Sequence, residues 1–363
     1  MVRCKKCIIP DSFPEISYVD GLCSFCRESD VDHRQQHLKG KEKLREVLKS
    51  KESGEYDCLV PVSGGKDSSF ILFYVVKELG LKPLALFVNN GFQGDLSIKN
   101  VKNMCRRLKV DLIIADPTRY REKAVFEALA CEELKNYGGI CGYCETVIRS
   151  TTIKVARNRG IHTAVWGSTN YEDTVTKYYL GWNDKTFRKD YGSRKTIRDT
   201  FRRYIDMTQK VAAVQGTLLH LFRFWVYSSL MKYELSISGI LYWLNPFAEF
   251  SFAQDKVQTA YFYDYIPYDP LKQVEVLKRE LGWETPTNQD TRFDCKLACF
   301  PNYEFLRQTG ITKVGFIKAT LVRKGLDNRE NALENELSGR ENLRKKCEET
   351  LRDLEKKRSN PIK

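Results

Sequence analysis

Six consecutive residues, Ser63-Gly64-Gly65-Lys66-Asp67-Ser68, bring together groups with which proteins hold phosphate. The two glycines let the backbone approach an oxyanion closely and leave amide N–H groups free to donate hydrogen bonds. Lys66 adds a point charge, and the hydroxyl groups of Ser63 and Ser68 add donors. The G-x-x-x-x-G-K spacing of the Walker loop is absent, and a simple strand-to-helix turn needs only one glycine. The stretch therefore predicts a nucleotide-phosphate loop of another type.

The residues on either side of this loop predict a strand before it and a helix after it. Residues 56–62 form a short apolar run, whereas residues 68–80 place apolar side chains at three- and four-residue steps. The alternation continues along the chain, with strands predicted at 83–90, 111–117 and 162–170 and helices at 97–109 and 147–160. This pattern predicts an α/β fold whose parallel sheet carries helices on both faces. Such sheets bind ligands at the carboxyl ends of their strands, where a helix N-terminus also favours anions.

The loop resembles the S-G-G-x-D-S loop of the PP-loop ATP pyrophosphatases, which activate a carbonyl oxygen as an adenylate and release pyrophosphate. The resemblance implies ATP and Mg²⁺ as cofactors, with Lys66, Asp67 and Ser68 in catalytic roles. That superfamily carries a glycine followed by acidic residues at a later strand end. The resemblance places the adenosine near Phe87, Val88 and Asn89. The glycine at the later strand end is Gly167, and it is followed by Glu172 and Asp173 as the implied magnesium ligands. The histidine that often follows the glycine is Ser168 here.

Eight of the twelve cysteines fall into close pairs. Cys4-x2-Cys7 is followed by Cys23-x2-Cys26, a spacing typical of a structural four-thiolate Zn²⁺ site. Each two-residue gap makes a tight turn that aims two sulfurs at one ion, and Gly21 suits such a turn. The other two pairs are Cys141 with Cys144, and Cys295 with Cys299. We expect metal rather than disulfides because nothing in the sequence indicates secretion.

The N-terminal four-cysteine stretch (residues 4–26, called the knuckle below) together with the loop narrows the resemblance to one family of these enzymes. Residues 4–26 followed by 56–68 are similar to the N-acetyl sugar amidotransferases of surface-polysaccharide biosynthesis, and so are 261–270 and 321–333. The resemblance implies a nucleotide-linked N-acetyl sugar as substrate, whose acetamido group is adenylated and then converted by ammonia into an acetamidine. Residue 2 is valine, so the chain has no N-terminal cysteine nucleophile for a glutaminase. The resemblance implies that a separate glutaminase subunit supplies the ammonia.

The second set of cysteines leaves an alternative function open. Cys141 and Cys144 with Cys295 or Cys299 offer three or four thiolates, which suit an iron–sulfur cluster. PP-loop tRNA thiolases use a similar C-x-x-C pair and a distant cysteine in this way. Under this hypothesis the protein inserts sulfur into tRNA or a small molecule. The net charge of +13 is compatible with nucleic acid, and equally with a nucleotide sugar.

The chain of 363 residues is long enough for more than one structural unit. We expect a zinc knuckle and linker helix (1–50), a PP-loop ATP-binding domain (51–180), a mainly helical substrate or partner region (181–325) and a charged helical tail (326–363). The N-terminus has no signal-peptide pattern, so we expect a cytoplasmic protein. The most apolar region, 211–247, is interrupted by Arg223, Lys232 and Glu234, so no transmembrane segment is predicted.

Overall fold

A computed structural model of the protein describes residues 2–14, 16–27, 39–49, 54–89, 91–116, 139–168, 257–286 and 293–359, together with Val125, Phe222 and Val226. Its centre is a five-stranded sheet with the order β5-β4-β3-β6-β7. Every neighbouring pair in this sheet is parallel. The strands are β3 (Cys58–Pro61), β4 (Pro83–Val88), β5 (Leu112–Ala115), β6 (Thr163–Trp166) and β7 (Gln258–Tyr261). The predicted parallel sheet is confirmed.

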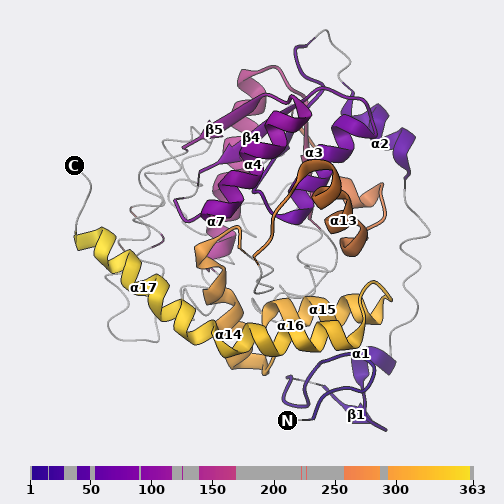
Figure 1. Ribbon diagram of the computed structural model, residues 1–363, viewed down its shortest axis with the longest axis vertical. Coiled ribbons are helices and arrows are strands. Elements are labelled where there is room, and N and C mark those ends of the chain that lie inside the picture. Colours follow the sequence, from indigo (N-terminus) through magenta and orange to yellow (C-terminus); the bar gives the residue numbers. More distant parts are fainter. Residues whose placement is uncertain are drawn as a thin grey trace, which may run out of the picture.

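Helices cover both faces of this sheet, as predicted (Figure 1). Side chains alternate along each strand, so Val60 and Phe87 enter one core while Leu59 and Leu86 enter the other. The first core is covered by α2 (Lys41–Leu48), α3 (Lys66–Lys77), α4 (Asp95–Leu108) and α13 (Pro270–Leu281). The second is covered by α7 (Gly139–Asn158). Because both faces of the central strands are buried, β3 and β4 are continuous apolar runs without polar alternation.

The fifth strand comes from a part of the chain far beyond the predicted nucleotide domain. β7 pairs with β6 from Thr163↔Gln258 to Trp166↔Tyr261, which places it at the edge of the sheet. The short 3₁₀ helix η2 (Phe262–Asp264) follows it directly, and α13 then packs against α3. The expected helical region 181–325 therefore also supplies a strand and a helix to the sheet domain.

The C-terminal region is helical. It comprises η3 (Lys296–Ala298), α14 (Cys299–Thr309), α15 (Lys313–Arg323), α16 (Arg329–Glu341) and α17 (Leu343–Ser359). In Figure 1 these helices form a layer apart from the sheet, and the N-terminal knuckle lies against α15 and α16. The knuckle consists of β1 (Tyr18–Val19), β2 (Leu22–Cys23) and α1 (Ser24–Arg27). It shares a core with the helices, in which the rings of Phe13 and Phe316 stack 5.2 Å apart.

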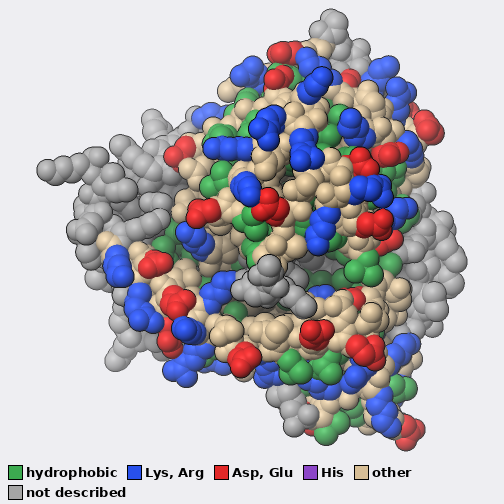
Figure 2. Space-filling model, in the orientation of Figure 1, with side chains coloured by type: hydrophobic (Ala, Val, Ile, Leu, Met, Phe, Trp, Pro, Cys, Tyr) green, Lys and Arg blue, Asp and Glu red, His purple; other side chains and the backbone are tan. Residues whose placement is uncertain are grey.

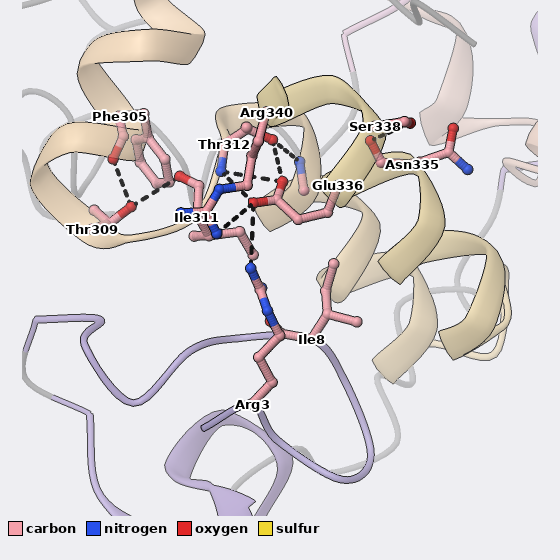
Figure 3. Close-up of polar contacts among 11 residues, drawn as sticks. Arg3, Ile8, Phe305, Thr309, Ile311, Thr312, Asn335, Glu336, Ser338 and Arg340 are labelled. Carbon is pink, nitrogen blue, oxygen red and sulfur yellow. Dashed lines mark hydrogen bonds and ion pairs between the residues drawn. The ribbon is translucent and has the colours of Figure 1, made fainter. Parts of the chain in front are cut away.

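A buried carboxylate also joins the knuckle to this helical layer (Figure 3). Glu336 of α16 accepts hydrogen bonds from the backbone N–H and the hydroxyl of Thr312, the N-cap residue of α15. Its carboxylate also lies 3.7 Å from the Arg3 guanidinium and 3.9 Å from that of Arg340. The two ends of the sequence are therefore held together by a charged group inside the protein. Within the described residues, no helix combines the length and the apolar character needed to cross a membrane.

Candidate active site and metal centre

The Ser63–Ser68 loop lies at the switch point of the sheet, where the order in which the strands are added changes from one side to the other. From β3 the chain proceeds through β4 to β5 on one side, and then returns to β6 and β7 on the other. The loop leaves the carboxyl end of β3 and enters α3 at Lys66. A crevice forms at such a switch point because the connections on its two sides run in opposite directions. The predicted phosphate loop therefore occupies the ligand-binding position of the fold.

Gly64 is required by the path of this loop. Its φ is +81°, and an ideal Cβ at this position would lie 2.2 Å from the carbonyl oxygen of Ser97 in α4. The Gly64 carbonyl accepts a hydrogen bond of 3.0 Å from the Trp283 indole N–H. The side-chain amide of Asn100 donates to the same carbonyl at 3.4 Å. The loop is thus fixed by backbone contacts to α4 and by a residue that follows α13.

The first turn of α3 is arranged to receive an anion. Gly65 is the N-cap residue and supplies no side-chain cap, so the orphan N–H groups of the first turn are not occupied by a capping oxygen. The Ser68 hydroxyl accepts from the Ser63 N–H at 3.1 Å, which closes the loop. The Gly65 N–H donates to the Ser63 hydroxyl at 3.3 Å. These hydroxyl groups face the same turn that offers the backbone donors.

Lys66 is engaged by the protein itself. Its ammonium group contacts Oδ1 of Asp67, the Tyr268 hydroxyl at 3.0 Å and Oε1 of Gln273 at 3.0 Å. An ammonium group has three N–H donors, and these three acceptors use them all. The Lys66 ammonium also lies 4.7 Å from the centre of the Tyr268 ring. The geometry therefore gives Lys66 the task of holding Asp67.

A second group holds the same oxygen of Asp67. The Tyr263 hydroxyl donates to Asp67 Oδ1 at 3.2 Å and accepts from the Gln273 amide at 3.1 Å. Burial raises the pKa of Tyr263 well above its ordinary value of 10, and the Asp67 charge acts in the same direction. Tyr263 therefore remains a neutral donor. Tyr263, Tyr268 and Gln273 were not predicted as site residues, although the aromatic run 261–268 is the signal that could have indicated them.

The other predicted nucleotide residues lie at neighbouring strand ends. An ideal Cβ at Gly167, just after β6, would lie 2.7 Å from Ile71 and 3.8 Å from Cβ of Asp67, so this glycine allows β6 to end against α3. Phe87 and Val88 are buried at the end of β4, which leaves contacts with a nucleotide to their backbone. Asn89 follows them and accepts from Gly91 N–H at 3.0 Å. Glu172 and Asp173 lie outside the described residues.

The segment that precedes α14 lies across the phosphate loop. The Lys296 N–H donates to the Phe92 carbonyl at 2.7 Å, and the Phe293 ring lies 5.7 Å from the Trp283 ring. Between these anchors, Asp294 brings a carboxylate oxygen to 3.2 Å from the Cβ position of Gly65. Asp294 was not predicted as a site residue. Ser63, Asp67, Ser68 and Asp294 all carry oxygen donors, the ligand type that Mg²⁺ prefers.

The surface beside the loop is basic. Lysine and arginine side chains predominate over the face that carries α4 (Figure 2). Those on α4 are the exposed residues Lys99, Lys102, Arg106 and Arg107. The N-terminal half of α4 also contacts the loop through Ser97 and Asn100. This charge distribution favours the approach of an anionic ligand to the loop.

The N-terminal cysteines form the predicted cluster. The sulfurs of Cys4, Cys7, Cys23 and Cys26 lie within 4.8 Å of one another, and all four residues are buried. Gly21 has a φ of +80°, the left-handed conformation that the turn requires. Hydrogen bonds from the Cys23 and Cys26 thiols lower the pKa of Cys7, so the cluster favours a thiolate there. Four convergent sulfurs fit a tetrahedral metal site.

Two arginines from the C-terminal helices contact residues of this cluster. The Arg323 guanidinium donates to the Cys7 sulfur at 3.7 Å. Arg329 donates to the carbonyls of Cys4 at 3.1 Å and Cys7 at 3.3 Å. Four thiolates around a divalent cation carry a net negative charge, which these arginines offset.

The second set of cysteines is not assembled among the described side chains. The only described group of three or more metal-ligating side chains is the N-terminal one. Cys299 is buried, and its thiol contacts the Lys296 carbonyl at 3.4 Å, the Thr350 hydroxyl at 3.8 Å and the thiol of Cys347. Cys144 in α7 and Cys295 before η3 are half-buried. The side chain of Cys141 lies outside the described residues.

Comparisons with known proteins give weak likenesses. No protein-family model matches the chain. The uncharacterized protein MJ1599 of Methanocaldococcus jannaschii is 26% identical over 170 residues, which are 46% of this chain and 58% of that protein, so the match spans little more than half of the relative. The U34-tRNA thiolase NcsA from Methanococcus maripaludis, solved with its [4Fe-4S] cluster, has a TM-score of 0.35 and 16% identity over 92% of this chain and 89% of its own. The NH3-dependent NAD synthetase from Campylobacter jejuni has a TM-score of 0.29 and 10% identity over 57% of this chain and 94% of its own.

Proposed function

We propose that this protein is an ATP pyrophosphatase-type enzyme, which activates an oxygen atom of its substrate with AMP and releases pyrophosphate. The observation that carries the proposal is the loop Ser63–Ser68, with its uncapped helix N-terminus at the switch point of a parallel sheet. Its sequence resembles the S-G-G-x-D-S loop of the PP-loop enzymes, and the basic face over α4 suits an anionic substrate.

Some of the loop residues bind phosphate, and others position a carboxylate. The backbone N–H groups after Gly65 and the hydroxyls of Ser63 and Ser68 bind phosphate oxygens and hold ATP for attack. Lys66 and Tyr263 fix the orientation of Asp67. Magnesium, when bound, neutralises the charge of the departing pyrophosphate, and Asp67 is one of the oxygen ligands that the chain offers it.

For the acceptor, we propose the acetamido group of a nucleotide-linked N-acetyl sugar. An amide oxygen is a very poor leaving group, whereas the same oxygen bonded to AMP leaves readily. Ammonia then attacks the carbon, AMP departs, and an acetamidine remains. This part of the proposal is supported by the similarity of residues 4–26 and 56–68 to the N-acetyl sugar amidotransferases. Ammonia would come from a separate glutaminase subunit.

The alternative function is sulfur transfer with an iron–sulfur cluster. It is favoured by the place of Cys295, which directly follows the residue that contacts the loop at Gly65. A cluster that takes Cys295 as a ligand, with Cys141 and Cys144 as the other proposed ligands, would then lie beside the loop that is proposed to activate ATP. Cys299 fits this set less well because its thiol is occupied by groups of α17.

For the N-terminal cluster we propose structural Zn²⁺. A closed set of four buried thiolates leaves no open position for a substrate. The arginines of α15 and α16 that contact the cluster support a role in fastening the C-terminal helices to the N-terminus.

Pyrophosphate release tests the proposed activity and separates the two acceptors. The purified protein, prepared anaerobically, would be incubated with ATP, Mg²⁺ and either a nucleotide-linked N-acetyl sugar with ammonium, or tRNA with a sulfide source. We expect pyrophosphate with the sugar and ammonium, and a colourless protein that holds zinc. Asp67→Ala should abolish this release without a change in the thermal unfolding midpoint. Several irons per chain and release only with tRNA would support the alternative instead, and unchanged turnover in Asp67→Ala would refute the site.

A further inference from the structure

The carboxylate of Asp294 lies beside the first helical turn that is proposed to bind phosphate. The distance from its Oδ2 atom to the Cβ position of Gly65 is 3.2 Å. Gly65 is the N-cap residue of α3, so this oxygen lies at the positive end of the helix. In the described part of the chain, no hydrogen bond or ion pair with another side chain accounts for this placement.

The position of Asp294 is set by contacts on both sides of it. On one side Phe293 packs on Trp283, whose indole N–H is bonded to the Gly64 carbonyl. On the other side the Lys296 N–H is bonded to the Phe92 carbonyl just beyond β4. An ideal Cβ at Gly94 would lie 2.4 Å from the Phe293 carbonyl, so the segment also packs tightly on the residue before α4. The segment is therefore tied to the same elements that fix the loop.

A carboxylate in this place conflicts with a bare phosphate. Both groups are anions, and both would lie at the same turn of N–H donors, where they repel each other. A divalent cation between them removes the conflict. Mg²⁺ is usually held by one or two carboxylates together with the phosphate oxygens of a substrate.

We propose that Asp294 is a ligand for the divalent cation that accompanies ATP, and that it acts together with Asp67. The inference rests on the proposed function, because the phosphate groups of the nucleotide complete the cation site. It assigns a direct role in metal binding to a residue that lies 227 positions after Asp67 in the sequence. It also makes nucleotide binding depend on the cation, because without it Asp294 repels the phosphates.

Binding measurements on the full chain test this assignment without turnover. Calorimetry would measure the affinity for a non-hydrolysable ATP analogue in the presence of a chelator. Electron paramagnetic resonance would measure Mn²⁺ affinity at a saturating concentration of the analogue. In Asp294→Asn we expect Mn²⁺ to bind at least about tenfold more weakly, while the metal-free analogue binds more tightly than in the wild type because the repulsion is gone. Asp294→Glu keeps the charge and should retain metal binding better than Asp294→Asn. Asp353→Asn, an exposed position on α17, is the matched control and should change neither affinity.

The outcomes separate the two proposals. If the wild type binds the analogue and Mn²⁺ together and Asp294→Asn binds both equally well, the assignment of Asp294 is overturned and the proposed function stands. If the wild type binds no nucleotide under any condition, the proposed function fails, and the assignment fails with it. Thermal unfolding of each variant shows whether a loss of binding reflects a loss of fold. If Asp294→Asn is unfolded, Asp294→Ser takes its place and has to show the same loss of Mn²⁺ affinity.

Discussion

The ammonium group of Lys66 lies 3.0 Å from Oε1 of Gln273, a residue 207 positions further along the chain. Gln273 is buried in α13 and also donates to the Tyr263 hydroxyl, which in turn donates to Asp67. Lys66, Asp67, Tyr263 and Gln273 thus form a closed ring of hydrogen bonds. A carboxylate held from two sides in this way keeps one orientation, and such preorganisation is what a charge-stabilising site requires.

Replacement of Lys66 by methionine should lower the rate of pyrophosphate release more than it weakens ATP binding. Lys66 donates its three N–H groups to Asp67, Tyr268 and Gln273. Removal of the ammonium group therefore releases Asp67 and leaves the phosphate contacts in place. We expect kcat to fall by about 100-fold and the Kd for ATP to change by less than about threefold. Steady-state kinetics and calorimetry measure the two effects.

The control for this prediction is Lys77→Met, an exposed position in the last turn of the same helix. It should change neither constant. Lys66→Arg should not rescue the rate, because a planar guanidinium cannot reproduce the three directions of an ammonium group. A large rise in the Kd for ATP with little change in kcat would instead mean that Lys66 binds phosphate directly.

The sheet, the loop and the knuckle could be predicted because each depends on residues that are close together in the sequence. The apolar run before Ser63 and the helical periodicity after Ser68 are local patterns, and so is the spacing of Cys4, Cys7, Cys23 and Cys26. Backbone geometry alone converts such patterns into a strand, a helix or a metal-binding turn.

The partners of the loop could not be predicted, because they are supplied by tertiary structure. The first two of the four residues of β7 are exposed, so this strand lacks the apolar run by which the other four-residue strands could be recognised. Only the pairing of β7 with β6 brings Tyr263 to Asp67. Asp294 is similarly placed by the packing of Phe293 on Trp283. The aromatic run 261–268 is a local signal for Tyr263, but it does not give the partner of that residue, and no local pattern marks Asp294.

Replacement of Gly64 by alanine should distort the phosphate loop. The φ of +81° is unfavourable for alanine, and the new Cβ would lie 2.2 Å from the Ser97 carbonyl oxygen, which belongs to a helix backbone and cannot easily move. We expect a loss of roughly 1–3 kcal/mol in the free energy of unfolding, together with loss of ATP binding. Chemical denaturation and calorimetry check the two parts.

Gly80→Ala provides a matched comparison for this prediction. Gly80 also has a positive φ, of +64°, but no atom lies within 4 Å of its Cβ position. It should lose about 1 kcal/mol of stability and retain ATP binding. Equal loss of ATP binding in both variants would mean that backbone strain in general, and not the close approach at Gly64, is responsible.

Removal of the metal from the N-terminal cluster should loosen the C-terminal helices. Cys7→Ser removes one of four buried sulfurs and also the acceptor of Arg323, so we expect zinc content to fall from one per chain to near zero. The stability should fall by several kcal/mol, on the order expected for a structural zinc site. Elemental analysis measures the zinc, and hydrogen exchange should show greater exchange in α15 and α16. Cys144→Ser lies outside the cluster and should keep the full zinc content; normal zinc in Cys7→Ser would exclude a four-cysteine site.

The buried carboxyl group of Glu336 should make stability depend on pH. Burial raises its pKa above the ordinary value of 4.5, although hydrogen bonds from Thr312 and the charges of Arg3 and Arg340 act against this rise. The folded protein therefore binds this proton more tightly than the unfolded chain. The resulting stabilisation is fully present below pH 4.5 and is lost as the pH rises through the higher pKa of the folded state. Each unit of difference between the two pKa values corresponds to about 1.4 kcal/mol.

Comparison of the wild type with Glu336→Gln isolates this contribution, because glutamine has nearly the same shape and does not titrate. Denaturation at a series of pH values should show the wild type gaining stability relative to Glu336→Gln as the pH is lowered from 7 towards 4.5. Glu334→Gln, on the exposed side of the same helix, is the matched control for the substitution itself. A difference between wild type and Glu336→Gln that stays constant with pH would mean that folding leaves the Glu336 pKa unchanged. Such a result would mean that the hydrogen bonds from Thr312 and the charges of Arg3 and Arg340 cancel the effect of burial on the Glu336 pKa.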